Sequence, residues 1–266
     1  MNKSKIMSSK GFGKKQHSKN RKKNEIIDTI EDSEALIQIG LVGGQLIQQA
    51  WNQDAQKFRQ KAENEYGTDL IKVRSLILCS LFDLLKFKAG IPGNTNDSIG
   101  ERLVLINVFA QGQWWTEKLI SEGQPIKAAA LLKQDIEIVT RLYEIRQGVA
   151  QFGKVPNMKY APTNLKEHYG DMNNIAHISK ACILENICTV VDSKGIKGVS
   201  ITPLFHAEDI KKQYELHINL CLIVTGEALE LFREMYGDDE EMLLPPLKLL
   251  DAARELLIKT GWFFTN

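Results

Sequence analysis

Apolar residues recur every three or four positions along most of the 266-residue chain, which is the spacing of one face of an α-helix. This pattern predicts helices over residues 32–58, 69–88, 98–121, 125–148, 165–190, 207–236 and 245–260. Only residues 194–205 alternate as a strand does, and this run is too short to found a sheet. We therefore predict an all-α bundle of about seven helices, with residues 194–205 as an ordered loop or small hairpin.

The first 28 residues have a different composition from the rest of the chain. They are rich in Lys, Ser, Gly and Asn and contain few large apolar side chains, so they cannot repay the entropy of ordering. Nine of the chain's 34 bases fall within residues 1–23, where there is no acid, and the rest carries a net charge of about −8. The sequence thus predicts a disordered basic arm over residues 1–28 and one helical domain over residues 29–266.

Two functions are open for this arm. Its bases include Lys14, Lys15, Arg21, Lys22 and Lys23, and such a cluster binds RNA or DNA by releasing condensed counterions. The same composition is also typical of a solubilising tail without a partner. The acidic remainder of the chain does not favour binding of polyanions.

The cysteines and the length of the apolar runs indicate the compartment. Each cysteine lies in an apolar run, without a CxxC pair or zinc-ligand spacing, so we interpret all four as core thiols in a reducing cytoplasm. These residues are Cys79, Cys182, Cys188 and Cys221. No apolar run approaches the roughly 20 residues that a membrane span needs. We expect a cytoplasmic protein without a membrane segment or a cofactor.

One short stretch, HYGDMNNIAHIS over residues 168–179, concentrates polar side chains in an otherwise helical pattern. On a helix, Asn173 and His177 are four residues apart and share a face. Ile175 and Ile178 flank His177, which suggests that its imidazole points into the bundle. A buried imidazole needs a partner, because an unpaired polar group in a core costs about 1 to 3 kcal/mol.

The helix predicted over residues 125–148 offers that partner. Its apolar run is crossed by Lys133 and Glu137, and Glu137 could accept a proton from His177, with Asn173 or Tyr169 close by. Alternatively, Glu137 and Lys133 form a solvated surface pair, and His177 is a core histidine that orders the packing of two helices. The five residues form our candidate binding set, and His177 with Glu137 is the candidate catalytic pair.

A zinc site is the weakest interpretation of the same stretch. It would use His168, Asp171 and His177 as ligands, but their spacing matches no zinc motif such as H-E-x-x-H. We therefore assign no metal to the chain.

The runs PIKAAALLKQDIEIVTRLYEI, YGDMNNIAHIS and ITPLF occur in this order ahead of a long predicted helix. This arrangement resembles a diffuse group of bacterial helical proteins related to HEPN domains, over about residues 128–236. The residues that match are Leu131, Leu132, Lys133, Glu137, Tyr169, Asn173 and His177. The resemblance implies a helical fold and a homodimer.

HEPN ribonucleases cleave RNA without metal, using an Arg and a His a few residues further on, paired across a dimer. Counting back from His177, the Arg positions hold Met172, Asp171 and Gly170, and none of them is basic. This departure removes the side chain that would stabilise developing negative charge. Our leading hypothesis is a non-catalytic interaction or regulatory protein, and the alternative is a metal-independent ribonuclease of a defence or toxin–antitoxin system using His177.

Overall fold

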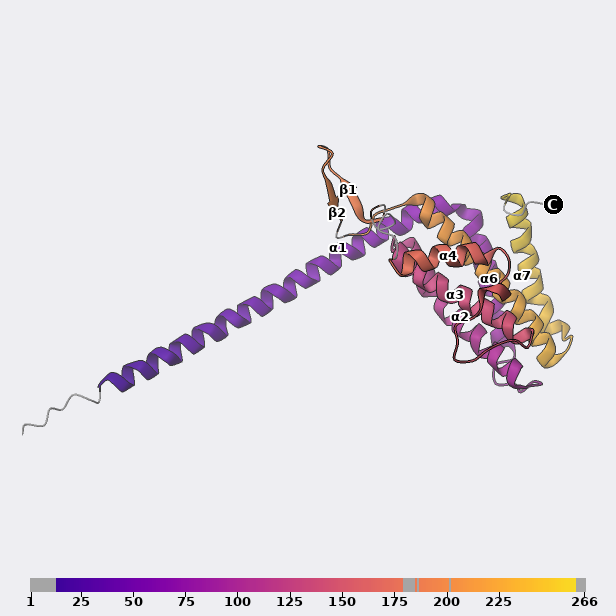
Figure 1. Ribbon diagram of the computed structural model, residues 1–266, viewed down its shortest axis with the longest axis horizontal. Helices are drawn as coiled ribbons and strands as arrows, with labels where there is room; N and C mark the ends of the chain where they lie inside the picture. Colours follow the sequence, from indigo (N-terminus) through magenta and orange to yellow (C-terminus); the bar gives the residue numbers. More distant parts are fainter. Residues whose placement is uncertain (1–12, 179–184, 186, 201, 262–266) are drawn as a thin grey trace, which may run out of the picture. The chain divides into compact units, whose positions relative to one another are not determined.

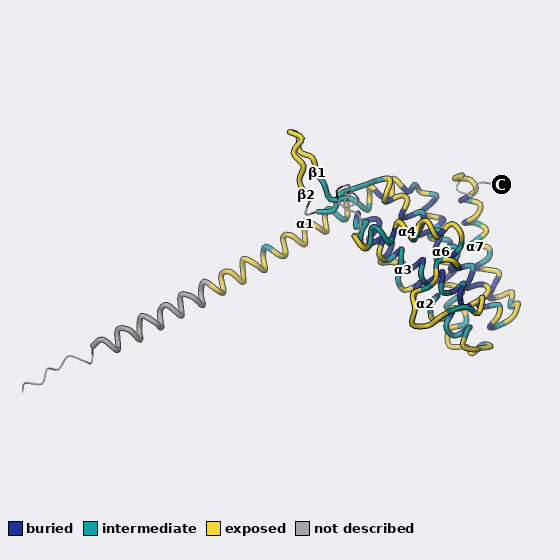
Figure 2. The backbone as a smooth tube through the Cα atoms, in the orientation of Figure 1, coloured by how far each residue is buried: buried dark blue, intermediate teal, exposed yellow. Residues whose placement is uncertain are grey.

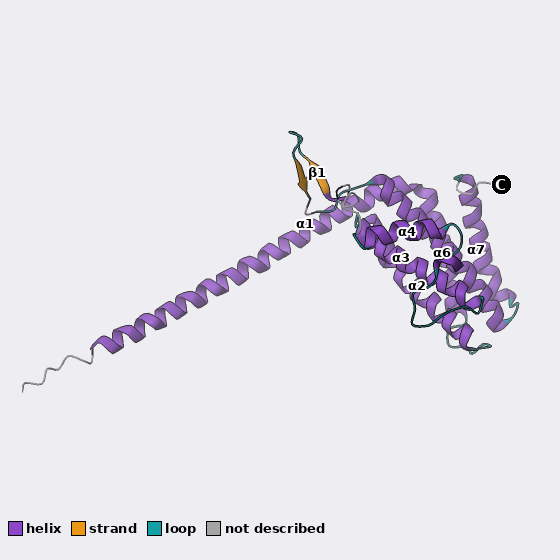
Figure 3. Ribbon diagram, viewed as in Figure 1, coloured by secondary structure: helices purple, strands orange, loops and turns teal. Residues whose placement is uncertain are grey.

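The computed structural model describes residues 13–178, 185, 187–200 and 202–261, and of residues 13–32 it describes the backbone alone. Over this part the chain is all-α, as the helical spacing predicts, with one two-stranded hairpin (Figures 1 and 3). The elements are α1 (Gly13–Phe87), α2 (Asp97–Ser121), α3 (Pro125–Arg146), η1 (Met158–Tyr160), α4 (Leu165–Ala176), β1 (Thr189–Val191), β2 (Lys197–Val199), α6 (Ala207–Tyr236) and α7 (Glu240–Lys259).

The chain divides into two compact units, Met1–Gln53 and Asp54–Asn266. The described part of the first unit is helix α1 alone, and the second unit holds the rest of α1 with all other elements. Helix α1 begins at Gly13, inside the segment predicted to be disordered. Residues 1–12 of the predicted arm lie outside the described residues, and so do the side chains of its five named bases.

Helix α1 joins two helices that the sequence pattern predicts separately. Residues 59–66, which lie between those two predicted helices, continue the helix, because Ala62 and Tyr66 are buried and extend the apolar stripe. At Gly67 the backbone leaves the helical region, with φ 74° and ψ 154°. This conformation is essentially restricted to glycine, so Gly67 marks the break between the two predicted helices.

The core of the second unit takes buried side chains from α1, α2, α3, α4, α6 and α7. Helix α3 packs against α2, α4 and α6, and α2 also packs against α6. The stripe predicted for the end of α1 is buried, including Val73, Ile77 and Leu81. Burying each such side chain contributes about 1.5 to 3 kcal/mol. The Oγ of Ser80 donates to the carbonyl of Pro246 at 3.0 Å, which ties α7 to α1.

The helix predicted over residues 165–190 is interrupted after residue 176, although residues 185, 187 and 188 are again helical. His177 caps α4, and Ile178 has a φ of 55°, a left-handed conformation that a β-branched residue rarely adopts. Residues 179–184 and 186 lie outside the described residues. Strand β1 then pairs antiparallel with β2, with Val190 opposite Gly198, so a hairpin forms but begins earlier than predicted.

The last helix also begins earlier than predicted. Helix α7 begins at Glu240 rather than at Pro245, because the side chain of Asp239 accepts a hydrogen bond from the Met242 amide and caps the first turn. Pro245 and Pro246 lie inside the helix. The capping side chain, not the proline, sets where the helix begins.

Candidate functional site

Four of the predicted site residues lie together, and we call them the α3–α4 cluster. Lys133 and Glu137 lie on α3, Tyr169 lies on α4, and His177 caps α4. The hydroxyl of Tyr169 donates to Oε1 of Glu137 at 2.9 Å. The Nζ of Lys133 lies 3.6 Å from the same oxygen and 3.1 Å from Nε2 of His177. Lys133 thus connects the carboxylate to the imidazole.

The predicted burial of His177 is wrong, because its side chain is exposed. Glu137 is bound by Tyr169 and Lys133, and the imidazole contacts Lys133 instead of the carboxylate. Helix α4 ends one residue before His177, so the backbone no longer directs that side chain into the bundle. Asn173 is half-buried and accepts a hydrogen bond from the His177 amide through its backbone carbonyl at 3.0 Å.

The chemistry of each group decides which atoms of the α3–α4 cluster donate a proton and which accept one. A lysine ammonium has only donors, so Nε2 of His177 is the acceptor in its contact with Lys133. Burial raises the pKa of Tyr169 to about 12, and the hydrogen bond to Glu137 adds to this shift. The ammonium of Lys133 lies 5.8 Å from the centroid of the Tyr169 ring, within the range of a cation–π interaction. Tyr169 therefore stays a donor at neutral pH.

His168 and Asp171, the other two proposed zinc ligands of the stretch, do not join His177 in the cluster. His168 and Asp171 are exposed side chains on α4. Among the residues that the structure describes, no group of three or more His, Cys, Asp or Glu side chains could hold a metal ion.

A buried histidine lies elsewhere, and the sequence reasoning missed it. His217 on α6 is fully buried, and its Nε2 lies 3.3 Å from Nε of Arg74 on α1. Arg74 also binds Oε2 of Glu117 on α2 at 2.6 Å. Burial, and then the charge of Arg74, lowers the pKa of His217 to about 3. The sequence feature that could have predicted its burial is its spacing, since His217 shares a helical stripe with Tyr214 and Cys221.

An aromatic stack lies beside this buried histidine. The rings of Tyr66 and Tyr214 have centroids 3.7 Å apart and an interplanar angle of 4°, and the Tyr66 hydroxyl lies 3.3 Å from Oγ of Ser121. These residues line a pocket of about 200 Å³ together with Glu63 and Glu117. Typical ligand sites have volumes of about 300 to 1,000 Å³, so the arrangement favours a structural role.

A second buried polar group lies on α3. Burial raises the pKa of Asp135 to about 8, although hydrogen bonds from Thr116 and Gln113 lower it. The Oγ1 of Thr116 lies 3.4 Å from Oδ2 of Asp135, and Sγ of Cys221 lies 3.0 Å from Oε1 of Gln113. Asp135 is therefore mostly protonated at pH 7, and its role, like that of the stacked tyrosines, is structural.

The cysteines follow the core prediction only in part. Cys221 is buried, Cys188 is half-buried, and Cys79 is exposed, so its assignment to the core is wrong. Cys182 lies outside the described residues. Cys79 follows Ile77 by two positions, which turns its side chain away from the buried face of α1.

A larger pocket of about 700 Å³ lies between α2 and the end of α3. Its wall includes Val104, Ile145 and Phe152, and Arg141 is its only base. The guanidinium of Arg141 already donates to Glu144 at 2.7 Å. The Oδ1 of Asn96, which also lines the pocket, already accepts a hydrogen bond from the Ile99 amide at 2.9 Å.

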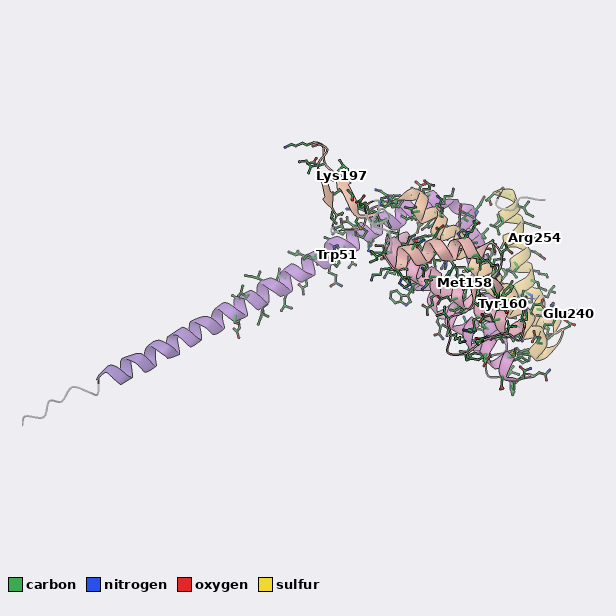
Figure 4. The ribbon with its side chains drawn as sticks, in the orientation of Figure 1. Trp51, Met158, Tyr160, Lys197, Glu240 and Arg254 are labelled. Atoms are coloured by element: carbon green, nitrogen blue, oxygen red, sulfur yellow. The ribbon has the colours of Figure 1, made fainter. Side chains whose placement is uncertain are left out.

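A run of exposed apolar side chains lies on α1, over residues 33–53, which we call the apolar segment. Every residue of the segment except Gly43 is exposed (Figure 2). Eight large apolar side chains are each between 51% and 68% exposed. They are Leu36, Ile37, Ile39, Leu41, Val42, Leu46, Ile47 and Trp51. Side chains stand on both sides of the α1 ribbon near the labelled Trp51 (Figure 4).

No described helix is both long enough and apolar enough to cross a membrane.

No family model, curated protein or solved structure matches the chain. The resemblance to HEPN-related proteins therefore rests on the sequence motifs alone.

Proposed function

We propose that the protein is a cytoplasmic, non-catalytic helical interaction protein that binds a partner through its apolar segment. The exposure of eight large apolar side chains on one helix carries this proposal. Helices of soluble proteins normally bury such a face, and contiguous exposed apolar patches mark interaction sites. Fully burying one such side chain contributes about 1.5 to 3 kcal/mol of free energy. A partner that covers the segment would bury several of them, and these contributions would favour binding.

The basic arm adds a second contact in this proposal. Its bases precede the apolar segment in the chain, and they would bind RNA or DNA with an affinity that falls steeply as salt is raised. The two contacts are chemically independent, because one buries apolar surface and the other releases counterions.

Affinity capture with four full-length baits tests the proposal. The baits are the wild type, Leu46→Glu, Gln49→Glu, and a variant with Lys14, Lys15, Arg21, Lys22 and Lys23 all changed to Gln. We expect Leu46→Glu to lose protein partners, Gln49→Glu to keep them, and the arm variant to lose RNA alone. Identical capture by all four baits would contradict the proposal.

One observation favours a second candidate function, metal-independent RNA cleavage. The arginine expected from the resemblance is absent, but Lys133 places its ammonium 3.1 Å from Nε2 of the exposed His177. A cation at that distance could stabilise negative charge developing on a phosphate. His177 would then act as the acid or base of the reaction.

Incubation with labelled RNA in the presence of a chelator tests this second candidate. We expect His177→Ala and Lys133→Met to lose cleavage if the α3–α4 cluster is catalytic. His168→Ala is the matched control, because His168 is an exposed histidine on α4, the helix that His177 caps. Absence of cleavage by the wild type, or equal cleavage by all variants, excludes the cluster as a nuclease site.

A further inference from the structure

We propose that the partner of the apolar segment is a second copy of the same segment, bound in the antiparallel direction. This inference rests on the proposed function, because it names the partner of the same surface. It is carried by the order of large and small residues along the segment and by the charges on either side of it.

The segment contains a seam with the alternating three- and four-residue spacing of a coiled coil. The seam consists of Leu36, Ile39, Gly43, Leu46, Ala50 and Gln53. In an antiparallel pair that sets Gly43 opposite Leu46, Ile39 lies opposite Ala50. A large residue thus faces a small one in each of these layers, which lets the two helices interdigitate. A Cβ added at Gly43 would have nothing within 4 Å, so this position is open to a side chain of the second copy.

The parallel arrangement lacks this complementarity. It would set Gly43 against Gly43 and Ala50 against Ala50, which leaves space unfilled in two layers. It would also bring the acidic residues 25–34, with five acids and no base, against the same residues of the second copy. Like charges placed side by side destabilise a helix pair.

The antiparallel arrangement instead brings opposite charges together. In the same register, the positions of Asp28 and Asp32 fall opposite those of Lys61 and Lys57. Both lysines are exposed. No charged residue occurs from residue 35 to residue 53, so the seam itself contains no ion that would lose its hydration on pairing.

A lipid surface fits the segment less well than a second copy does. Helices that lie on membranes carry Lys and Arg on the polar face. Here the polar face holds Gln38, Gln45 and Gln49, which fall within about 40° of one another at 3.6 residues per turn. The acidic residues 25–34 also separate the basic arm from the apolar segment and would be repelled by anionic lipids.

Sedimentation of the full-length protein tests the inference. We expect wild type and Gln49→Glu to sediment at no less than twice the mass of one chain. Leu46→Glu places the same charge in the seam, and we expect its self-association to weaken by about tenfold or more. Because Leu46 and Gln49 are both exposed, neither change should unfold the chain.

Cysteine cross-linking tests the direction of pairing. Tagged Leu36→Cys protein is mixed with untagged Gln53→Cys protein, and wild type is run beside them to show any cross-link through native cysteines. We expect a disulfide between the two variants. Cross-linking of each variant only to itself would contradict the antiparallel pair.

Two further outcomes separate this inference from the proposed function. If the wild type is a monomer but captures another protein, or a phosphatidylcholine–phosphatidylserine vesicle, and Leu46→Glu does not, the second copy is excluded while the segment remains a binding surface. If the wild type is a monomer and Leu46→Glu behaves like it in every assay, both proposals are wrong.

Discussion

The Nε of Arg74 lies 3.3 Å from Nε2 of His217 inside the second unit. Because a guanidinium has only donors, Nε2 must accept, and the proton of the neutral imidazole sits on Nδ1. That nitrogen is buried and has no hydrogen-bond partner among the described residues. A second proton on the ring would face Arg74, so the fold holds His217 neutral.

We predict that His217 makes the folded state less stable in acid. Its pKa is about 3 in the folded chain and 6.5 in the unfolded one, so between these values the unfolded chain binds more protons. Stability from this group is complete above pH 6.5 and is lost on acidification toward pH 3, by at most about 1.4 kcal/mol per pH unit. Urea unfolding of His217→Gln should show that this dependence is gone, and His168→Gln should keep it.

Asp135 is predicted to act in the opposite direction. Its pKa rises from 3.8 to about 8 on folding, so stability from this group is complete below pH 3.8 and is lost as the pH rises toward 8. Between about pH 4 and 6.5 the effect of Asp135 opposes that of His217, and above pH 6.5 His217 no longer contributes to the pH dependence of stability. Asp135→Asn should therefore be more stable than wild type at pH 8 in urea unfolding. The two proteins should converge near pH 4, and an equal difference at both pH values would contradict the assigned pKa.

The helices could be predicted because the spacing of apolar residues is a local pattern. Whether an apolar stripe is exposed is not a local property, and the sequence pattern did not predict it. Leu70, Val73 and Ile77 follow the helical spacing and are buried. Leu36 and Ile39 follow the same spacing and are exposed. Spacing reports that a helix has an apolar face, whereas burial of that face depends on what other part of the chain, or what partner, reaches it.

The sequence predicted which residues lie at the candidate site better than it predicted the contacts between them. Lys133, Glu137, Tyr169 and His177 do lie together, because two adjacent helices bring them there. The exposure of His177 depends on the end of α4 at the left-handed Ile178, which carries no local signal. The contact of His217 with Arg74 joins residues far apart in the chain, and only the packing of α1 against α6 creates it.

A double-mutant cycle should separate the contacts of the α3–α4 cluster. Tyr169→Phe removes the hydrogen bond to Glu137 and should cost about 0.5 to 1.5 kcal/mol. Its effect should couple to that of Glu137→Ala, because the two side chains touch. His177→Ala should cost less than about 0.5 kcal/mol, since the side chain is exposed. Urea unfolding measures all three, and a coupling of His177 to Glu137 as large as that of Tyr169 would contradict these contacts.

The break in α1 gives a prediction in which two glycines differ only in backbone conformation. Gly67 has a φ of 74°, whereas Gly112 lies in the interior of α2. An added Cβ would meet nothing within 4 Å at either position. Gly67→Ala should therefore destabilise the fold by about 1 to 3 kcal/mol through backbone strain alone. Gly112→Ala should stabilise it by about 0.5 to 1 kcal/mol, because alanine favours a helix.

Urea unfolding of these two variants beside the wild type decides whether the break at Gly67 exists in solution. If α1 ran straight through Thr68, an alanine at position 67 would adopt helical angles and stabilise the chain as it does at position 112. Opposite signs for the two substitutions therefore identify a fixed kink, because the added methyl group and its open surroundings are the same at both positions.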